Sequence, residues 1–405
     1  MSYARFLSSL TRFMRRSEIR ELLKLTEKGD VISLAGGLPD PNVFPIDDVI
    51  DAAVKVLREE GGKALQYSPT RGVTRYREEL AKFLERTRGF RVDAEEVIVT
   101  TGSQQALDIV ARTLIDPGDV VIVEEPTYLA ALNAFRPARP RFVGVPIDDN
   151  GMRVDVLEEK LRRLRDEGLK LKFLYTVPIA QNPSGVTLSV ERRRRLLELA
   201  EEYDFLIIED DVYGLLVYRE DIDTTPLKAM DKSGRVVYVG SFSKILSPGF
   251  RLGHMVAPRE LSNYFELSKQ SMDLHTPSIT QYITAELLRS GAIERNIPRV
   301  KKVYSEKLRV MLEAIEESFP EGVWYTRPVG GMFVWVKLNA PVDTSEMLKK
   351  AVARGVAYVP GKAFYHDYSG IDTMRLNFTY PPKEKIRRGI EILAGVIKEE
   401  LGARG

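Results

Sequence analysis

The chain has 405 residues, of which 44% are hydrophobic and 29% are charged, so it is long enough to bury a large core in two parts. Its 60 basic and 58 acidic side chains nearly cancel, which argues against nucleic acid or an anionic membrane as the partner and favours a small molecule. The absence of cysteine excludes disulfides and thiolate chemistry, and because His254, His275 and His366 show no ligand spacing, we expect no catalytic metal.

The N-terminal segment, residues 1–20, has basic residues that interrupt each apolar stretch, which is not the pattern of a secretory signal. No run of about 20 apolar residues occurs, so the sequence predicts no transmembrane helix. We therefore expect a cytoplasmic protein. The many charged residues, the missing cysteines and the few Asn and Gln residues are typical of thermophile proteins.

From about residue 95 to 260, short apolar runs alternate with segments of helical period, and this alternation predicts an α/β unit around a mostly parallel sheet. Ligands in such sheets bind at the carboxyl ends of the strands. The predicted strands are EEVIVTTG, DVVIVEEP, LKFLYTVP, FLIIEDDVYG, RVVYVGSFSK and GHMVAP.

After residue 290 the pattern changes to a long charged helix, about 294–319, followed by three strand-like runs, GGMFVWVKL, VAYVPG and TMRLNF. We interpret this part as a smaller α+β domain. The expected division is an N-terminal arm at 1–45 that covers the active site and part of the small domain, a large domain at 46–290, and a small domain at 291–405, with a cleft between the two domains.

Lys244 lies in SFSKILSPGFRLG, directly after the apolar run VVYVG, so its amine is expected at a strand end. A lysine there can form an imine with an aldehyde cofactor and later act as a general base. Ser241, Ser243 and Arg251 lie close enough in sequence to bind one phosphate group. A surface lysine in a polar loop is the alternative; the S-x-x-K pattern of serine enzymes lacks its SDN and KTG companions.

A second anion signal is TTGSQQAL. Gly102 permits a turn, and Ser103 and Gln104 open a predicted helix whose free N–H groups and dipole favour a dianion. An ordinary helix N-cap has the same pattern. Neither G-x-G-x-x-G nor the P-loop pattern occurs, so dinucleotide and P-loop sites lack their main support.

Asp210 ends the apolar run FLIIED, and Tyr213 follows three residues later. A carboxylate at a buried strand end needs a cationic partner, which a pyridinium N–H would supply. The alternative for Glu209, Asp210 and Asp211 is a metal site or a solvated turn. Asn182, in QNPSG, has an amide that can donate to a phenolate oxygen, although a surface turn has the same composition.

In their order and spacing, NPSG, Asp-x-x-Tyr, S-x-S-K and R-L-G resemble the fold type I, class I/II aminotransferases over essentially the whole chain. The resemblance is closest to the 2-aminoadipate, kynurenine and archaeal aromatic aminotransferases, through SEIRELLKL, ISLAGGLPDPNVFP and ALQYSPTRG. It implies pyridoxal 5'-phosphate as the cofactor. Asp211 stands where many relatives have glutamate, a departure that should not alter the chemistry.

The resemblance also implies a role for each matching residue. Lys244 resembles the Schiff-base lysine, Asp210 the partner of the pyridine nitrogen, and Tyr128 the residue that stacks on the ring. Tyr213 and Asn182 resemble the donors to the ring hydroxyl. Tyr67 matches a tyrosine that reaches the phosphate of the neighbouring subunit, which implies a homodimer with shared active sites. The residues that resemble the phosphate cup are Gly102, Ser103, Gln104, Ser241, Ser243 and Arg251.

For the substrate, Arg375 in TMRLNF is similar to the arginine that binds the α-carboxylate, helped by Asn182 and the backbone at Gly37. Arg20 matches an arginine that meets a distal carboxylate, and an ordinary solvated arginine is the alternative. The implied reaction moves an amino group from an L-amino acid (2-aminoadipate, glutamate, aromatic or branched-chain) to a 2-oxo acid, usually 2-oxoglutarate, by a ping-pong mechanism through Lys244.

Two other functions stay open at this point. A lyase or decarboxylase with the same cofactor and fold would carry the same cofactor-binding residues, because reaction choice depends on the orientation of the Cα bonds. Aminotransferase-like domains also occur in transcription regulators, after an N-terminal winged-helix module. Here the aminotransferase pattern begins near Met1, so we expect an enzyme and not a regulator.

Overall fold

The structure is a computed structural model that describes residues 3–14 and 31–402. Its largest element is an eight-stranded sheet with the order β2-β9-β8-β7-β6-β3-β4-β5. These strands span Val97–Thr100 (β2), Val120–Glu125 (β3), Arg141–Asp148 (β4), Gly151–Met152 (β5), Leu171–Thr176 (β6), Leu206–Asp210 (β7), Val236–Ser241 (β8) and Gly253–Val256 (β9).

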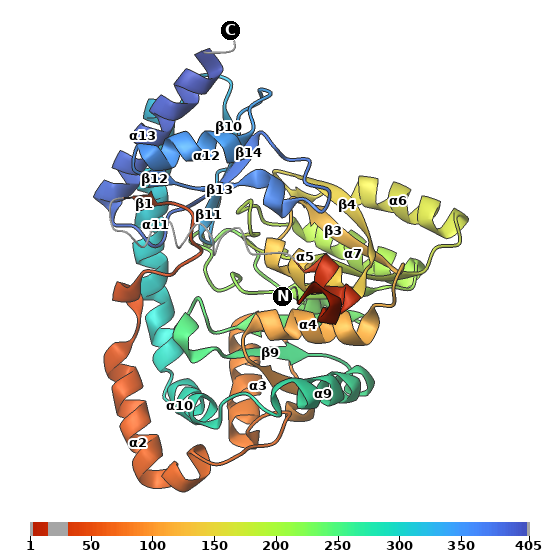
Figure 1. The fold of residues 1–405 in the computed structure, drawn as a ribbon. Helices are drawn as coiled ribbons and strands as arrows, with labels where there is room; N and C mark the ends of the chain where they lie inside the picture. Colours follow the sequence, from red (N-terminus) through yellow and green to blue (C-terminus); the bar gives the residue numbers. More distant parts are fainter. Residues whose placement is uncertain (1–2, 15–30, 403–405) are drawn as a thin grey trace.

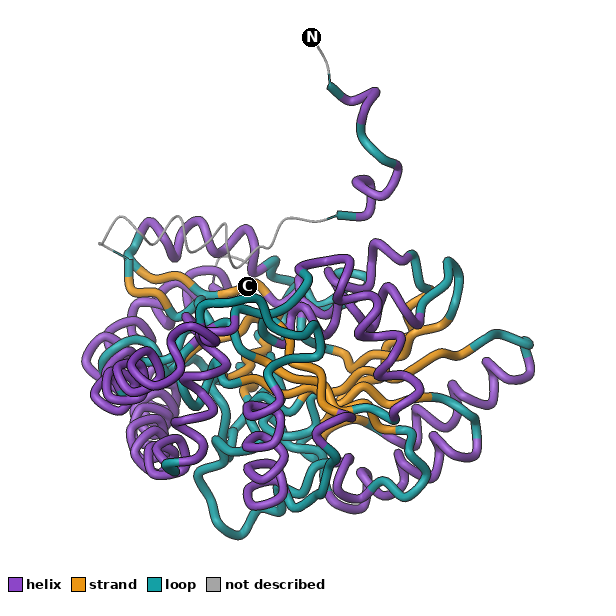
Figure 2. Tube along the Cα trace, turned by 90° about the horizontal axis from the view of Figure 1, so that it is seen from below, coloured by secondary structure: helices purple, strands orange, loops and turns teal. Residues whose placement is uncertain are grey.

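The centre of this sheet is parallel. The β4, β3, β6, β7 and β8 strands pair in parallel, whereas β9 runs antiparallel to both β8 and β2, and β5 antiparallel to β4. Every residue of β2 and β8 is buried, as apolar runs covered on both faces require. Figure 2 shows the strands in the middle of the molecule with helices on both sides. The predicted α/β class is therefore confirmed.

Twelve α-helices in the described part of the chain surround the two larger sheets (Figure 1). They are Ile46–Ala64 (α2), Thr74–Arg88 (α3), Ser103–Leu114 (α4), Leu129–Phe135 (α5), Val154–Asp166 (α6), Val190–Glu202 (α7), Leu227–Met230 (α8), Arg259–Asp273 (α9), Ser278–Arg289 (α10), Ala292–Ser318 (α11), Thr344–Ala353 (α12) and Lys383–Gly402 (α13). Short 3₁₀ turns are Ala4–Phe6, Ser9–Phe13, Pro41–Val43, Ala94–Glu96, Arg136–Ala138, Pro248–Phe250 and Gly361–Phe364 (η1 to η7). No helix among the described residues combines the length and apolar character needed to cross a bilayer.

A second, antiparallel sheet with the order β10-β11-β14-β13 lies in the C-terminal part, where Figure 1 shows it beside α12 and α13. Its strands span Trp324–Tyr325 (β10), Phe333–Lys337 (β11), Val359–Pro360 (β13) and Thr373–Asn377 (β14). A third pairing joins an early segment of the chain to a late one, since β1 (Ile32–Ser33) lies parallel to β12 (Val356–Ala357). The N-terminal segment after residue 30 is therefore attached to the C-terminal part.

The run 356–361 differs from its expected form. Instead of one strand, it makes two strands of two residues that belong to different sheets, with the buried Tyr358 between them. In the large sheet, the strand β4 was not predicted, because only two of its eight residues are fully buried and its sequence, RFVGVPID, contains Gly and Pro.

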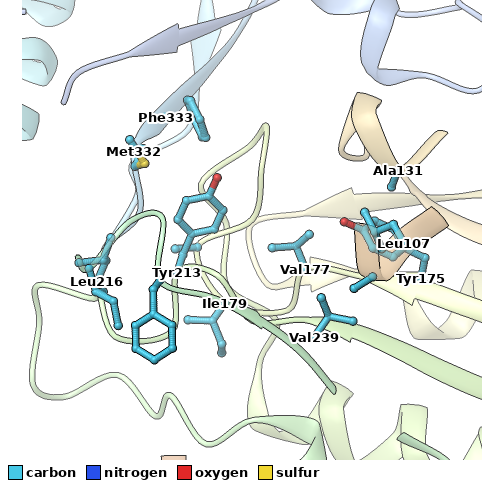
Figure 3. Packing of buried hydrophobic residues seen from close by; sticks show 14 of the residues in the cluster. Leu107, Ala131, Tyr175, Val177, Ile179, Tyr213, Leu216, Val239, Met332 and Phe333 are labelled. Atoms are coloured by element: carbon cyan, nitrogen blue, oxygen red, sulfur yellow. The ribbon is translucent and has the colours of Figure 1, made fainter. Parts of the chain in front are cut away.

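The main hydrophobic core continues from the large sheet to the C-terminal sheet. Figure 3 shows Tyr175, Val177 and Ile179 on the strand β6 and its following loop, and Tyr213 reaching toward Met332 and Phe333 near β11. Tyr213 and Phe333 meet edge to face, with their ring centroids 6.1 Å apart. This contact brings the loop after β7 to the start of β11, and both border the cavity described next.

Candidate active site

A cavity of about 440 Å³ lies where the loops after the parallel strands meet β11 and β14. Asp210 ends β7 and Ser241 ends β8, so two of the predicted site residues are placed by the ends of neighbouring strands. Most of the residues predicted for the site line this cavity: Gly37, Ser103, Gln104, Tyr128, Asn182, Asp210, Tyr213, Ser241, Ser243, Lys244, Arg251 and Arg375.

Lys244 lies in the turn between β8 and η6. Its Nζ donates a hydrogen bond to the carbonyl oxygen of Gly37 at 2.8 Å. Burial, and then the charges of Arg375 and Arg251, lower the pKa of Lys244 to about 8. A larger fraction of this amine is therefore neutral near neutral pH than for an ordinary lysine, which makes it a better nucleophile and base.

Asp210 is 2% exposed. One carboxylate oxygen, Oδ2, accepts a hydrogen bond from the Tyr175 hydroxyl at 2.8 Å. The other, Oδ1, is buried without a hydrogen-bond partner among the described residues. Burial raises the pKa of Asp210 to about 7, although the Tyr175 hydrogen bond opposes this rise. A cationic N–H group placed against Oδ1 would stabilise the charged carboxylate.

Asn182 connects two other predicted residues. Its Nδ2 donates to the Tyr213 hydroxyl at 3.4 Å, and its Oδ1 accepts from Arg375 Nη1 at 2.9 Å. Burial raises the pKa of Tyr213, so its hydroxyl stays protonated and can donate to an oxygen in the cavity.

Arg375, on β14, is 1% exposed and lies between two aromatic rings. Its guanidinium carbon is 4.0 Å from the ring centroid of Phe333 and 5.0 Å from that of Phe364. Nη2 donates to the carbonyl oxygen of Ala35 at 2.9 Å. Burial lowers the pKa of Arg375 to about 10, which still leaves it charged at neutral pH. A charged, buried guanidinium held in one orientation is suited to bind a carboxylate.

A further group of residues in the cavity could bind an anion. The helix α4 begins at Ser103, and amides in the first turn of a helix have no partner within it. Ser241 Oγ donates to Ser243 Oγ at 3.0 Å, and Arg251 Nη2 donates to the carbonyl oxygen of Thr101 at 3.3 Å. Gly102 precedes the helix with φ of +77°, and a Cβ atom there would lie 2.4 Å from Arg251 Nη2. The positive φ therefore favours glycine at this turn, and a side chain there would also displace the end of Arg251.

The other predicted residues occupy different positions. Tyr128 precedes α5 at the wall of the cavity, and Gln104 Nε2 donates to the carbonyl oxygen of Ala130 at 3.2 Å. Tyr67 does not line the cavity; its side chain is 78% exposed and its ring lies 5.7 Å from that of His275. Arg20 lies outside the residues that the structure describes.

Three acidic residues in a row, Glu209, Asp210 and Asp211, have separate partners. Glu209 accepts from the backbone N–H groups of Leu227 and Lys228 at 2.6 and 2.8 Å. Asp211 accepts from Arg88 Nε at 2.6 Å and from the Tyr238 hydroxyl at 2.8 Å. Of the three, only Asp210 lines the cavity, because side chains alternate in direction along a strand.

Sequence reasoning missed several residues of this site. Phe333 and Phe364 enclose Arg375, and Tyr175 orients Asp210, but all three lie in apolar or aromatic runs that read as ordinary core. Leu38 and Leu129 also line the cavity. The only available signal was that Tyr175 ends the apolar run LKFLY, which put a hydroxyl at a strand end.

The arrangement fits a planar pyridine ring with a phosphate group. Asp210 Oδ1 suits a ring N–H, the Tyr213 and Asn182 pair suits a ring oxygen, and the anion-binding group in the same cavity suits a phosphate. Lys244 lines the same cavity.

Comparison with known proteins supports this interpretation. The family model described as aminotransferase class I and II matches residues 29–393. The aromatic-amino-acid aminotransferase 1 of Thermococcus litoralis is 49% identical over 99% of this chain and 96% of its own length. A solved kynurenine aminotransferase from Pyrococcus horikoshii, in complex with PMP, is 49% identical, covers 98% of both chains and has a TM-score of 0.95.

A solved α-aminoadipate aminotransferase from Thermus thermophilus, complexed with N-(5'-phosphopyridoxyl)-L-leucine, is 38% identical, covers 100% of both chains and has a TM-score of 0.92. These likenesses extend over nearly the whole chain and confirm the fold expected from the sequence.

Proposed function

Because the chain belongs to the class I and II aminotransferases, which use pyridoxal phosphate, we propose that it moves an amino group between L-amino acids and 2-oxo acids in two half-reactions. One observation carries the proposal: a lysine amine, a buried carboxylate with one oxygen unpartnered among the described residues, and a buried arginine line a single cavity. They are Lys244, Asp210 and Arg375, and they supply the base, the ring partner and the carboxylate-binding group.

Pyridoxal phosphate, when bound, supplies an aldehyde carbon that condenses with amines and a protonated ring that accepts electrons from Cα. Asp210 would hold the ring N–H through Oδ1, while Tyr175 fixes its other oxygen. Tyr213 and Asn182 would donate to the ring oxygen, and Tyr128 would pack against the ring. The phosphate would be held by Gly102, Ser103, Gln104, Ser241, Ser243 and Arg251.

Arg375 would bind the substrate α-carboxylate through the guanidinium edge, with Asn182 and the aromatic rings fixing its plane. The Lys244 amine, once free of the cofactor, would take the proton from the substrate Cα, and its lowered pKa suits that role. The same groups would act in reverse on the second substrate, which gives a ping-pong sequence. The Gly37 carbonyl that accepts from Lys244 would hold the free amine at the cavity.

For the substrate side chain, we propose aromatic and branched-chain amino acids together with acidic ones, and 2-oxoglutarate as the usual acceptor. Leu38, Leu129 and Phe333 form an apolar part of the cavity wall that suits the first two groups. Arg20, outside the described residues, is proposed to meet the distal carboxylate of an acidic substrate. The names of the relatives, which include aromatic, kynurenine and 2-aminoadipate aminotransferases, support the aromatic and acidic parts of this range.

We further propose that residues 46–290 form the cofactor-binding domain, that 291–405 form the small domain, and that the chain works as a homodimer. Ile46, Ile50, Val54 and Leu57 lie on one face of α2, and each is at least 42% exposed. Tyr67, near the end of the same helix, is proposed to reach the phosphate of the neighbouring subunit. In residues 3–14, η2 packs against η5, while the part before it extends away from the body in Figure 2 and exposes Tyr3, Phe6 and Leu7, which suit contact with a second copy.

An amino-donor screen tests the reaction. The purified enzyme would be mixed with glutamate, 2-aminoadipate, phenylalanine or leucine, and both the absorbance of the bound cofactor and the released 2-oxo acid would be followed. We expect the aldehyde form to convert to the amine form and to return when 2-oxoglutarate is added. Product without the amine form would indicate a lyase or decarboxylase and refute the proposal.

Two variants test the finer assignments. Arg20→Ala should lose more activity with glutamate and 2-aminoadipate than with phenylalanine; equal losses would remove the distal-carboxylate role. Ile50→Glu places a charge on the exposed α2 face and should shift the mass measured by light scattering from dimer to monomer. A wild-type protein that is already monomeric would refute the homodimer.

A further inference from the structure

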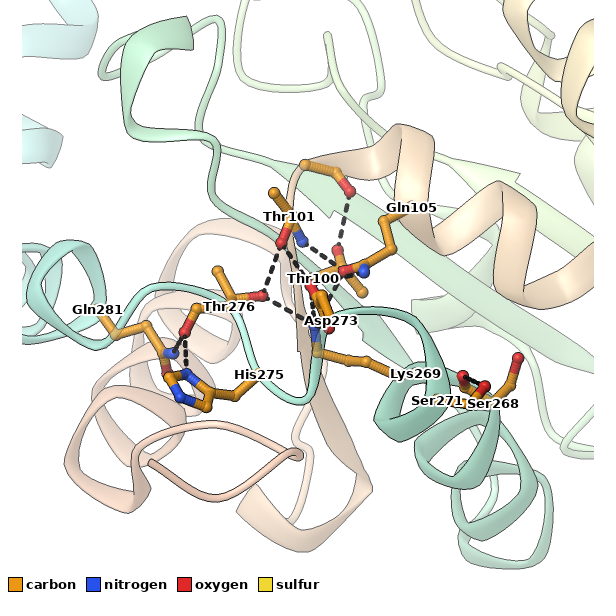
Figure 4. A network of polar contacts seen from close by, with 11 residues as sticks. Thr100, Thr101, Gln105, Ser268, Lys269, Ser271, Asp273, His275, Thr276 and Gln281 are labelled. Carbon is orange, nitrogen blue, oxygen red and sulfur yellow. Dashed lines mark hydrogen bonds and ion pairs between the residues drawn. The ribbon is translucent and has the colours of Figure 1, made fainter. Parts of the chain in front are cut away.

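A polar network with a fully buried lysine at its centre lies behind the turn that begins α4 (Figure 4). Its centre is Lys269 on α9, a lysine whose side chain is 0% exposed. Lys269 Nζ is 2.9 and 3.0 Å from the two carboxylate oxygens of Asp273, 2.9 Å from Gln105 Oε1 and 3.0 Å from Thr276 Oγ1. Its ammonium group is therefore completely satisfied by side chains from three different segments.

The network also holds the residue next to Gly102. The backbone N–H of Thr101 donates to Gln105 Oε1 at 2.8 Å, which is the same oxygen that accepts from Lys269. Thr101 Oγ1 donates to Asp273 Oδ2 at 3.0 Å, and Gln105 Nε2 donates to the same oxygen at 2.7 Å. Since the carbonyl oxygen of Thr101 accepts from Arg251, both backbone groups of Thr101 are fixed.

None of the central residues of this network, Gln105, Lys269, Asp273 and Thr276, lines the cavity, so none is positioned to contact a ligand there. A lysine without exposed surface is costly to bury unless its charge has a function or a partner that repays the cost. Here the partners are the residues that set the position of the α4 turn. A purely packing role would be served by an apolar side chain of similar length.

We propose that Lys269 is a positioning residue for the cofactor phosphate: through Gln105, Asp273 and Thr101 it holds the Gly102–Ser103–Gln104 amides and Arg251 in the geometry that binds the dianion. The inference rests on the phosphate position given under the proposed function. It concerns affinity for the phosphate, and it assigns no step of the reaction to Lys269.

The test compares two ligands that differ only in the phosphate. Full-length holoenzyme would be dialysed against graded concentrations of pyridoxal phosphate or of pyridoxal, and the bound cofactor would be read from its absorbance. For Lys269→Met we expect about a tenfold loss of affinity for pyridoxal phosphate and little change for pyridoxal, because only the phosphate uses the displaced amides. The ³¹P chemical shift of the bound phosphate should move as well.

The matched control is Lys307→Met. Lys307 is also a buried lysine, 6% exposed at its side chain, that donates to Asp40 Oδ2 at 2.6 Å and to the carbonyl oxygen of Thr379 at 2.7 Å. It should lower stability without changing the ratio of the two affinities. An equal loss for both ligands in Lys269→Met, or no loss for either, would overturn the inference. If Lys269→Met does not fold, Asp273→Asn is measured instead. An unchanged ratio of the affinity for pyridoxal phosphate to that for pyridoxal overturns the inference, and a lower ratio supports it.

Arg251→Met separates this inference from the phosphate position on which it rests. If Arg251→Met leaves the affinity ratio unchanged, the proposed phosphate site is wrong. If Arg251→Met lowers the ratio and Lys269→Met does not, the phosphate site stands and only the role of Lys269 fails.

Discussion

The buried carboxylate of Asp210 predicts how the stability of the cofactor-free protein depends on pH. The pKa of Asp210 is raised from 3.8 to about 7 in the folded chain, chiefly by burial. The folded state therefore holds a proton that the unfolded state releases between these two values. Stability from this group is complete below about pH 4 and is lost as the pH rises through about 7.

The magnitude follows from the same values. A pKa raised from 3.8 to about 7 corresponds to about 4 kcal/mol in total, of which about 2.5 kcal/mol is lost between pH 5 and pH 8. Asp210→Asn removes the titration but keeps an oxygen that can accept from Tyr175. Relative to wild type, the variant should therefore gain about 2.5 kcal/mol of unfolding free energy on going from pH 5 to pH 8.

Urea unfolding of both cofactor-free proteins at pH 5 and pH 8, at one protein concentration, measures this difference. Burial also raises the pKa of Glu124 and Glu209, to about 7 and about 8, but their effect is present in both proteins and cancels. A relative gain below about 1 kcal/mol would refute the reasoning. Saturating pyridoxal phosphate should abolish the part of the wild-type loss that is due to Asp210, because the ring N–H then stabilises the charged carboxylate.

Three further predictions concern the cavity. The rate at which added pyridoxal phosphate becomes covalently attached should rise with pH and level off above about 8, since burial lowers the pKa of Lys244; a rise continuing to pH 10, followed by stopped-flow absorbance, would contradict this. Phe364→Leu should raise the KM for amino acids about tenfold with little change in kcat, because it removes one aromatic face from Arg375; kcat falling at constant KM would count against that role. Gly102→Ala should weaken binding of pyridoxal phosphate, measured by dialysis, more than Gly89→Ala does, because both positions have positive φ but only a methyl group at position 102 would collide with Arg251.

Much of the large sheet could be predicted from the sequence because most residues of its strands β2, β3, β7 and β8 are buried and read as continuous apolar runs. The catalytic candidates Asp210 and Lys244 were identifiable for the same reason, since each is a charged residue at or just after the end of such an apolar run. Strands that are only partly buried, such as β4, gave no comparable signal.

The parts that could not be predicted depend on contacts between distant segments. The rings of Phe333 and Phe364 enclose Arg375, and the carbonyl oxygen of Ala35 accepts a hydrogen bond from it. The local sequence around each of these residues does not indicate that they are in contact. The network around Lys269 is similar, because α9 reads as an ordinary amphipathic helix and its lysine as a solvated one. In the structure, the Lys269 side chain is completely buried, so it is not a solvated lysine.

The parallel pairing of β1 with β12 bears on the order in which the chain can be completed during synthesis. The last strand of the large sheet ends at Val256, so that sheet can assemble while the rest of the chain is still unmade. Residues 32–37, although translated early, obtain their β partner only when Val356 and Ala357 have emerged. Since Ala35 and Gly37 contact Arg375 and Lys244, the substrate-binding side of the cavity is the last to form, after the cofactor-binding side.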